Sequence, residues 1–496
     1  MPFSPRRLQR RSNWRINLMP QRPNILFVFA DQHRHDALGC AGNTLIETPN
    51  IDRLSSSGVR FTDAWCQSPI CQPSRAALIT GRYPHELGVM RNFGPDMDSG
   101  WPTFMKQLQQ AGYNTANIGK THYYAEGLAA PDGETDMRQF STRVAEFGFD
   151  HVVEEFDRYV HAMDNVHTPY TSYLKEEGVH ETYCEKLKSI WRLTEHHWDG
   201  VTSPLTKEQD LTSFLTREAQ SWLALQSAAQ PFFLQMSYVQ PHVPLMGDPE
   251  WASFYRELQI PRGPGGSDVA DVPIWNDYLN WCGQHASAHL LTDEYVLAGA
   301  RQYYAMISLI DECIGQLVCQ LEAQGMLDNT WIVYSADHGE MLGDHSLMAK
   351  FNFYRGSVQV PLIVRPAGGC TPLASEALAA VVDIGPTLLD VAGAEPLQEI
   401  RGRSLLPVIS QGKGGREVLF SEIQKQTRND PAPTFRAVRN HRYRLTLETT
   451  TETPCEIFDL IEDPDELQNR VSDPSLASVT AELTGQLRDC ISPAAS

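Results

Sequence analysis

The sequence lacks a long hydrophobic run. No apolar stretch approaches the roughly 18 residues that a membrane-spanning helix needs. The first twenty residues contain arginines at positions 6, 7, 10, 11 and 15, but no apolar segment follows them that could serve as the core of a signal peptide. We therefore expect residues 1–21 to form a disordered basic tail, and we expect a cytoplasmic protein with no membrane partner.

Positive charge is also scarce. The 41 Lys and Arg residues face 61 Asp and Glu residues, which gives a formal net charge of −20. A protein that binds nucleic acid needs a basic face for the phosphates, so we expect no nucleic-acid partner. An anionic substrate would have to be held by a small local group of basic side chains.

The cysteines lack the spacing of a structural site. No pair forms a CxxC zinc motif, and ten cysteines in 496 residues are too sparse for a disulfide framework, so reduced thiols are the simpler prediction. The ten are Cys40, Cys66, Cys71, Cys184, Cys282, Cys313, Cys319, Cys370, Cys455 and Cys490.

Four apolar stretches have the pattern of strands buried on both faces of a sheet, and polar residues follow each of them. The stretches are residues 24–30, 113–119, 231–239 and 329–336. In parallel sheets, ligand groups gather beyond the carboxyl ends of the strands. The candidate site residues at these ends are Asp31, Gln32, Lys120, His122, His242, Asp337 and His338.

The fold class that this pattern predicts is α/β, with a large central and mostly parallel sheet sandwiched by helices. Amphipathic helices are expected at 101–111 and 293–324, a further strand at 357–365, an insertion at 125–210 and a loop at 260–290. Beyond residue 400 the pattern changes to short strands at 435–439, 443–447 and 456–460, followed by a helix at 475–490. We expect a catalytic domain at 22–400 and a smaller C-terminal subdomain at 401–496, built from an antiparallel sheet and a helix.

The stretch from residue 68 to 82 combines a cysteine, a helix start and an arginine. Pro73 suits a first helical turn and Gly81 can end the helix, so Cys71 is predicted to lie just before the helix N-terminus. Free backbone N–H groups at that end favour an anion, and Arg75 adds a positive charge one turn later. The alternative is that Cys71 is a buried and inert thiol.

The run Cys-x-Pro-Ser-Arg-x-x-x-x-Thr-Gly-Arg, which begins at Cys71, resembles the signature of the type I sulfatases, formylglycine-dependent enzymes of the alkaline phosphatase superfamily. The resemblance is greatest to the branch of the arylsulfatases and phosphonate monoester hydrolases. It implies that a formylglycine-generating enzyme converts Cys71 to formylglycine (3-oxoalanine), whose hydrate is the nucleophile. Gln72 stands where a small residue is commoner in the family.

The resemblance also implies one divalent metal ion held by four residues: Asp31, Gln32, Asp337 and His338. Carboxylate and amide oxygens favour Ca²⁺. The imidazole of His338 stands where many sulfatases have asparagine, and it makes Mn²⁺ the alternative.

The remaining roles come from the same resemblance. Arg75 would hold the hydrate, Lys120 would bridge it to the sulfate, and Lys350 would neutralise the sulfate oxygens. His242 would protonate the leaving alcohol, and His122 would take the proton that allows sulfate to leave. Asn92, which follows the cysteine helix, is a further expected substrate-binding residue.

The predicted function is hydrolysis of sulfate monoesters, with a small sulfated sugar or aryl sulfate as substrate. A phosphonate monoester or phosphodiester hydrolase with the same nucleophile is the first alternative, favoured by the Asp31-Gln32 and Asp337-His338 pairs and by Asn92. Lys120 and His122 favour the sulfatase. A non-catalytic binder of sulfated ligands is a more distant alternative, and a homo-oligomer is compatible with the sequence.

Overall fold

A computed structural model describes residues 22–92, 94–124, 135–162, 166–192, 200–265, 291–424 and 434–492. The predicted tail at 1–21 and most of the predicted loop at 260–290 lie outside these ranges. Within them, no helix combines the length and the apolar character needed to cross a membrane. The nine cysteines that they contain are free thiols.

The centre of the molecule is an eight-stranded sheet with the strand order β13-β2-β12-β11-β1-β9-β4-β6. From β11 to β6 all neighbours are parallel, whereas β12 is antiparallel to both β11 and β2. The mostly parallel sheet predicted from the sequence is therefore confirmed. Its strands are β1 (Asn24–Ala30), β2 (Val59–Phe61), β4 (Asn114–Lys120), β6 (His151–Glu155), β9 (Phe232–Tyr238), β11 (Thr330–Ala336), β12 (Leu362–Arg365) and β13 (Leu373–Ser375).

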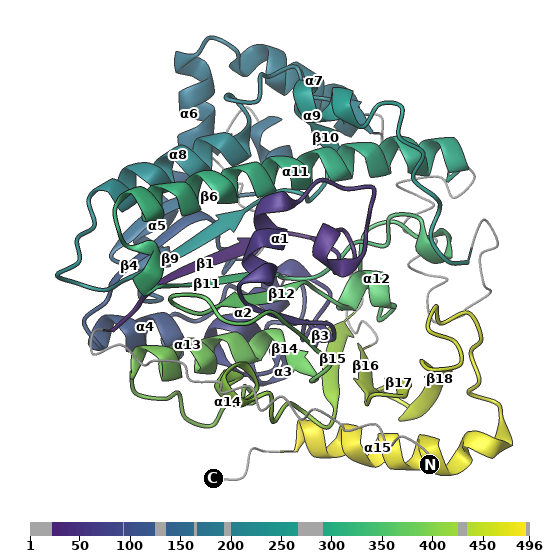
Figure 1. Cartoon of the computed structure of the whole chain (residues 1–496). Coiled ribbons are helices and arrows are strands. Elements are labelled where there is room, and N and C mark those ends of the chain that lie inside the picture. Colours follow the sequence, from purple (N-terminus) through teal and green to yellow (C-terminus); the bar gives the residue numbers. More distant parts are fainter. Residues whose placement is uncertain are drawn as a thin grey trace, which may run out of the picture.

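Helices cover both faces of this sheet (Figure 1). All seven residues of β1 are buried, and alternate side chains enter two different cores. Leu26 packs in the core beneath α8 (Leu211–Ala224) and α11 (Asp293–Ala323), and this core also contains Ile310. Phe27 packs in the core on the opposite face with Phe104 of α4 (Phe104–Gln110). The apolar stripe predicted on the 293–324 helix is buried as expected.

The helices have the following bounds: α1 (Pro49–Ser56), α2 (Cys71–Thr80), α3 (Pro84–Leu87), α4 (Phe104–Gln110), α5 (Met137–Ala145), α6 (Pro169–Glu176), α7 (His180–Arg192), α8 (Leu211–Ala224), α9 (Pro249–Phe254), α11 (Asp293–Ala323), α12 (Arg355–Val358), α13 (Ile384–Ala392), α14 (Leu406–Gln411) and α15 (Ala477–Ile491). Short paired strands complete the fold: β3 (Ala64–Trp65) with β14 (Ala379–Ala380), β5 (Thr135–Asp136) with β7 (Val166–His167), and β8 (Val201–Thr202) with β10 (Met246–Gly247).

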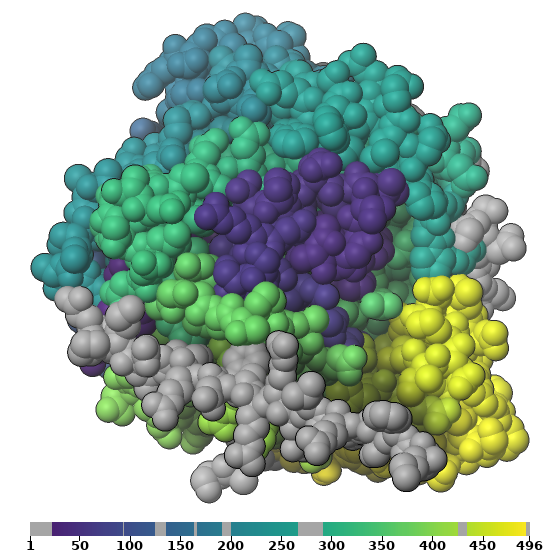
Figure 2. All heavy atoms as spheres, in the orientation of Figure 1, coloured from purple at the N-terminus to yellow at the C-terminus, as the bar shows by residue number. Residues whose placement is uncertain are grey.

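A second, four-stranded sheet near the C-terminus is antiparallel throughout. Helix α15 packs against it, and the two form the yellow corner of the molecule in Figures 1 and 2. This confirms the predicted antiparallel sheet with a helix. The strands are β15 (Leu419–Gln424), β16 (Thr434–Arg439), β17 (Tyr443–Glu448) and β18 (Thr453–Asp459).

One predicted strand was wrong in its first half. Residues 357–365 were expected to be extended throughout, but residues 355–358 form the short helix α12 and the strand begins only at Leu362. Pro361 precedes the strand and has no N–H to donate to a sheet. The apolar run in the sequence therefore spans a helical turn, a proline and a short strand.

Candidate active site

The carboxyl ends of β1, β4, β9 and β11 meet at one edge of the sheet. Ala30 is level with Ala336 of β11 and with Tyr238 of β9. The residues that follow, Asp31 and Asp337, are held by backbone hydrogen bonds from Asp31 N to Tyr238 O and from Asp337 N to Ala30 O. Two carboxylates far apart in the sequence therefore lie side by side.

The Cys71 thiol lies beside this pair. Its Sγ is 2.9 Å from the Lys350 Nζ, 3.2 Å from the His338 Nε2 and 3.9 Å from the nearer Asp31 oxygen. Cys71 is the first residue of α2, and Ile70 before it is extended, so the helix begins one residue earlier than the sequence predicted. The thiol is completely buried.

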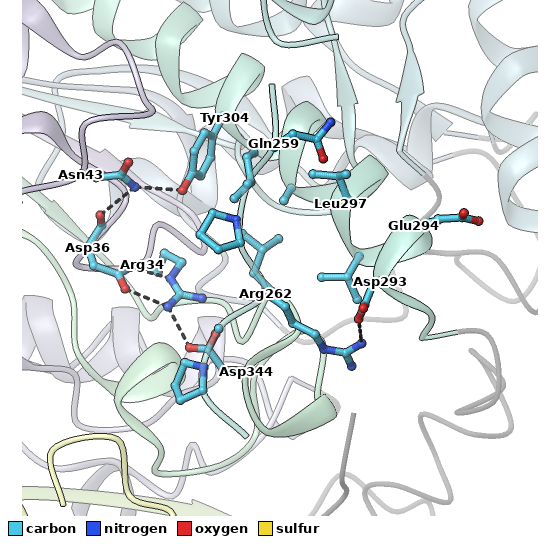
Figure 3. A pocket seen from close by; sticks show the side chains of 17 residues that line it. Arg34, Asp36, Asn43, Gln259, Arg262, Asp293, Glu294, Leu297, Tyr304 and Asp344 are labelled. Carbon is cyan, nitrogen blue, oxygen red and sulfur yellow. Dashed lines mark hydrogen bonds and ion pairs between the residues drawn. The ribbon is translucent and has the colours of Figure 1, made fainter. Parts of the chain in front are cut away.

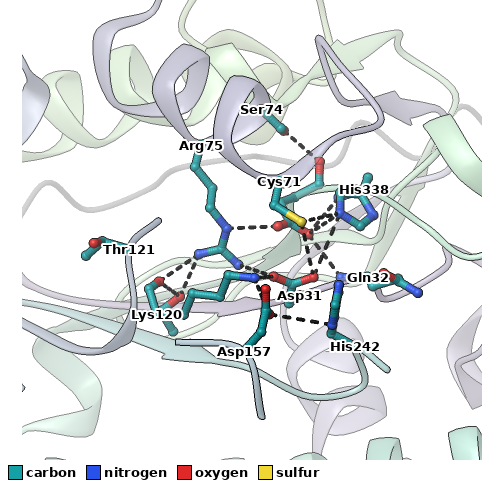
Figure 4. Close-up of polar contacts among 12 residues, drawn as sticks. Asp31, Gln32, Cys71, Ser74, Arg75, Lys120, Thr121, Asp157, His242 and His338 are labelled. Carbon is teal, nitrogen blue, oxygen red and sulfur yellow. Dashed lines mark hydrogen bonds and ion pairs between the residues drawn. The ribbon is translucent and has the colours of Figure 1, made fainter. Parts of the chain in front are cut away.

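Arg75, one turn along α2, joins the two carboxylates (Figure 4). Its Nε donates to Asp337 at 2.8 Å and its Nη2 donates to Asp31 at 3.2 Å. Its Nη1 donates to the Lys120 carbonyl at 2.7 Å. The guanidinium thus fixes the ends of three strands with respect to the cysteine helix.

The charge of Asp31 is set by cations. Burial alone would raise the pKa of this carboxyl, but Lys120, His242, Arg75 and Lys350 together hold it well below its ordinary value. Lys120 reaches Asp31 at 2.7 Å, and Asp157 together with Asp31 keeps the pKa of the lysine raised in spite of its own burial. Asp31 and Lys120 are therefore both ionised at neutral pH.

The same edge of the sheet could hold a metal ion. Ligand atoms of Asp31, Cys71, Asp337 and His338 all lie within 4.8 Å of one another, and all four residues are buried. The His338 Nδ1 is 3.0 Å from the Gly339 carbonyl, which can only accept, so Nδ1 carries the proton and Nε2 presents a lone pair to the cluster. Burial, reinforced by Lys350, lowers the pKa of His338 to about 4, so the ring is neutral at pH 7.

Asp157 completes the site, and sequence reasoning missed it. It follows β6, within the segment predicted only as an insertion. One of its oxygens accepts from the Lys120 Nζ and lies 3.5 Å from the His242 Nδ1 (Figure 4). The buried carboxylate of Asp157 therefore connects His242 to Lys120 in the cluster, and no sequence motif indicates this residue.

Comparisons with known proteins agree with this geometry. The sulfatase family model matches residues 23–394, and the model of the C-terminal part of N-sulphoglucosamine sulphohydrolase matches residues 343–492. The chain belongs to the sulfatase family. This confirms the type I sulfatase fold and enzyme class inferred from the Cys71 motif.

Among relatives, the sulfatase is 27% identical to an N-acetylglucosamine-6-O-sulfatase of Bacteroides thetaiotaomicron, over 95% of this chain and 86% of that protein. It is also 27% identical to a multifunctional alkaline phosphatase superfamily protein of Trinickia caryophylli, over 93% of each. Among solved structures, the phosphonate monoester hydrolase of Agrobacterium radiobacter is similar with a TM-score of 0.79 and 26% identity, over 95% of each chain.

Two predicted residues of this sulfatase lie around the cluster. The Asn92 Oδ1 accepts from the backbone N–H of Gln72 at 3.1 Å, next to Cys71 at the start of α2. His122 packs its ring edge-on against Phe156, with centroids 4.9 Å apart. Burial, followed by the charge of Lys120, holds the pKa of His122 well below its ordinary value, so its ring is neutral.

Glu154 holds the turn that carries Lys120 and His122. Its Oε1 accepts from the Thr121 N–H at 2.9 Å, the Thr121 hydroxyl at 2.8 Å and the Tyr124 hydroxyl at 2.8 Å. Burial raises the pKa of Glu154 to about 8, because these neutral donors only partly offset the loss of water. The carboxyl is therefore mostly protonated at pH 7.

A separate cavity of about 490 Å³ lies beside the loops that follow β1 and β11 (Figure 3). Arg34 on its wall donates to Asp36 and to Asp344, with Nη2–Oδ2 distances of 2.8 Å for both. The cavity is lined by both signs of charge, and none of the metal-ligand candidates lines it.

Proposed function

We propose that the protein hydrolyses sulfate monoesters to an alcohol and inorganic sulfate, with residue 71 as the nucleophile. The observation that carries this proposal is the set of cations around Cys71. The Lys350 Nζ lies 2.9 Å from its Sγ, and both Lys120 and Arg75 contact the neighbouring Asp31. Cations in a buried site stabilise the charge on a transferring sulfuryl group far better than in water.

We infer that Cys71 is converted to formylglycine by a formylglycine-generating enzyme. The Sγ atom stands in the position from which the modified residue would present oxygen. Addition of water to the formylglycine aldehyde gives a hydrate, whose hydroxyl supplies the oxygen nucleophile that an unmodified thiol lacks. The burial of residue 71 at the first turn of α2 keeps it in a fixed orientation with bulk water excluded.

The donor set fits a divalent metal ion bound by Asp31, Asp337, His338 and Gln32. Two carboxylates and an amide oxygen suit Ca²⁺, which we propose first, and the neutral imidazole makes Mn²⁺ the alternative. A bound ion would supply Lewis-acid polarisation of the nucleophile and of the sulfate. Arg75 holds both carboxylates in place through their Oδ2 atoms, whereas their Oδ1 atoms face Cys71 and His338.

We assign the proton for the leaving alcohol to His242. Its Nδ1 faces the Val243 carbonyl at 2.9 Å and Asp157 at 3.5 Å, and both can only accept, so Nδ1 is a donor. The proton transferred to the alcohol would therefore come from Nε2 of the imidazolium, which Asp157 stabilises. His122, kept neutral by burial, would accept the proton from residue 71 that allows sulfate to leave.

The substrate class that fits is a small sulfated molecule, such as a sulfated sugar or aryl sulfate. Support comes from the relative named as an N-acetylglucosamine-6-O-sulfatase. We place the reaction in a catalytic domain at residues 22–400, supported by a subdomain at 401–496. A cytoplasmic location remains part of this proposal.

Hydrolysis of phosphonate monoesters or phosphodiesters is the second candidate. It is favoured by the similarity to the phosphonate monoester hydrolase of Agrobacterium radiobacter and by Asn92 next to the nucleophile. Lys120 and His122 favour sulfate, because the resemblance to sulfatases assigns roles to both, and they place a cation at the end of β4 and a proton acceptor just beyond it.

Two measurements test the proposal. The tryptic peptide of residues 61–75 should be lighter than encoded and should react with a carbonyl reagent, with fragmentation distinguishing Cys71 from Cys66. The kcat/KM should be higher for an aryl sulfate than for the matched phosphonate and phosphate diester. A preference of about tenfold for either phosphorus ester, ~1.4 kcal/mol in transition-state binding, would favour the second candidate. Full activity with unmodified Cys71 would exclude the formylglycine mechanism.

A further inference from the structure

The segment from Gly339 to Phe351 has an unusual backbone. Besides Gly343, five of its residues have φ between 48° and 75°, the left-handed region that side chains disfavour. They are Leu342, His345, Ser346, Ala349 and Phe351. Such a backbone persists only where surrounding groups hold it, and this one sets the position of Lys350.

The carboxylate of Glu340 holds the segment from inside. Its Oε1 accepts from the backbone N–H groups of Leu342, at 2.9 Å, and of Ala349, so that the two ends of the strained stretch meet at one atom. Its other oxygen accepts from the Gln32 Nε2. Glu340 is completely buried, and Gln32 is the one candidate metal ligand that it contacts in the described hydrogen bonds and ion pairs.

We propose that Glu340 is a positioning residue that turns the amide oxygen of Gln32 toward the metal site and fixes Lys350 beside residue 71. The Gln32 NH₂ group donates to the Glu340 Oε2, so its amide Oε1 faces the other way. That oxygen lies 3.0 Å from the Lys350 Nζ. A reversed amide would place NH₂ against an ammonium group and against a carboxylate-lined metal site.

Arg34 holds the same segment from outside. Its Nη1 donates to the Glu340 carbonyl at 3.2 Å and to the Met341 carbonyl at 2.9 Å, and its Nη2 donates to Asp344 (Figure 3). Asp344 thus faces the cavity, whereas the Glu340 side chain faces Gln32. Because the outer contacts use other groups, a change at Glu340 removes only the inner contacts.

The inference rests on the proposed metal site, so its test measures metal binding directly. Metal-stripped protein is titrated calorimetrically with Mn²⁺ and, separately, with Ca²⁺. Glu340→Gln keeps the size of the side chain but presents NH₂ to Gln32, which reverses the Gln32 amide. Loss of such an outer contact typically weakens metal binding about 10–100-fold, and we expect a loss in that range.

A double-mutant cycle with Gln32→Ala tests whether Glu340 affects metal binding through Gln32. Gln32→Ala should weaken binding on its own, and Glu340→Gln should add less than about twofold in that background, because the two residues act as one unit. Glu340→Asp, which keeps the charge but is one methylene shorter, provides a second variant and should also weaken binding.

Asp311→Asn is the matched control. Asp311 is a buried carboxylate that accepts from two backbone N–H groups, of Asn50 at 3.1 Å and Ile51 at 2.7 Å, but it has no contact with the site. Its replacement should lower the Tm and leave metal affinity unchanged.

The outcomes separate the inference from the proposed function. Metal affinity within twofold of wild type in both Glu340 variants, or a fully additive loss in the double mutant, would overturn the role of Glu340 while leaving the metal site intact. Failure of the wild-type protein to bind either ion would overturn the metal site, and the inference with it. Glu340→Ala, which removes all the inner contacts, should raise KM because Lys350 loses its fixed position, whereas Asp311→Asn should not. An unchanged KM in Glu340→Ala would overturn the effect on Lys350.

Discussion

Asp31 and Glu154 are both fully buried at the same edge of the sheet, yet at pH 7 Asp31 is ionised and Glu154 is mostly neutral. Asp31 follows β1 and is surrounded by Lys120, Arg75 and Lys350, which hold its pKa well below the ordinary value. Glu154, in β6, accepts only from neutral donors, and burial raises its pKa to about 8. Burial is common to both, so the neighbouring cations decide the difference.

The comparison separates two tasks of the site. The region around Asp31 maintains full charges, which can bind a cation and a sulfate. The region around Glu154 maintains the shape of the turn that carries Lys120 and His122, and a neutral carboxyl is sufficient for that. Asp157 lies between the two regions and links Lys120 to His242.

The largest effect is expected for Asp31→Ala. The change removes a proposed metal ligand and the shared partner of Lys120 and Arg75, and metal polarisation contributes several kcal/mol, so kcat/KM should fall at least ~10³-fold. Elemental analysis should find the purified variant depleted of metal. Unfolding in urea should show a loss of about 3–5 kcal/mol, the usual cost of breaking a buried ion pair. Retention of metal and activity would mean that the cations around Asp31 are structural only.

An intermediate effect is expected for Asp157→Asn. Without this carboxylate the His242 imidazolium is less stable, so proton donation to the leaving alcohol should weaken. General acid catalysis is typically worth about 10²–10⁴-fold, so kcat/KM for an alkyl sulfate should fall about 10²-fold. An aryl sulfate with an acidic phenol needs little protonation and should lose much less activity. An equal loss for both substrates would contradict the assigned role of His242.

The smallest effect on activity is expected for Glu154→Gln. Glu154 is mostly protonated at pH 7, so an uncharged replacement of the same size should change kcat/KM by no more than about threefold, ~0.7 kcal/mol. The effect should appear in stability instead. The wild-type carboxyl holds a proton up to a pKa of about 8 in the folded state and only up to about 4.5 in the unfolded state.

Between these pH values Glu154 holds a proton in the folded protein but not in the unfolded chain, so its contribution to wild-type stability falls as pH rises. Glu154→Gln removes that contribution, and its Tm relative to wild type should increase from pH 5 to pH 8. Parallel Tm profiles across this range would show that Glu154 is ionised in the folded state and would remove the contrast with Asp31.

Much of the site could be predicted from sequence because its residues directly follow apolar strands. Asp31 and Asp337 each come one residue after a continuous buried run, and parallel strands bring such positions together. Cys71 was recognisable from its helix-starting context and motif, with an error of one residue in the helix start. In each case a local pattern is sufficient to place the side chain.

Asp157, Glu154 and Glu340 could not be predicted in the same way, because their roles come from long-range contacts. Asp157 and Glu154 lie in a segment without a clear hydrophobic period, and only the pairing of β6 with β4 brings them to the turn after Lys120. Glu340 lies within Asp-His-Gly-Glu, but its function depends on a backbone of left-handed residues that no residue type there signals. The first half of the strand predicted at 357–365 was wrong for a related reason, since apolar residues occupy buried helical turns as well as strands.

The position of β1 also has a consequence for how the protein is made. The first strand of the chain lies between β9 and β11, with Ile25 level with Phe233 and with Trp331. A ribosome adds about 5–20 residues per second, so this apolar strand waits roughly 15–60 s before its second neighbour has been synthesised. During that time the sheet cannot close, and pairing over such long sequence separations is intrinsically slow. The nascent chain should therefore depend on protection of residues 24–30 from aggregation until β11, at residues 330–336, has emerged.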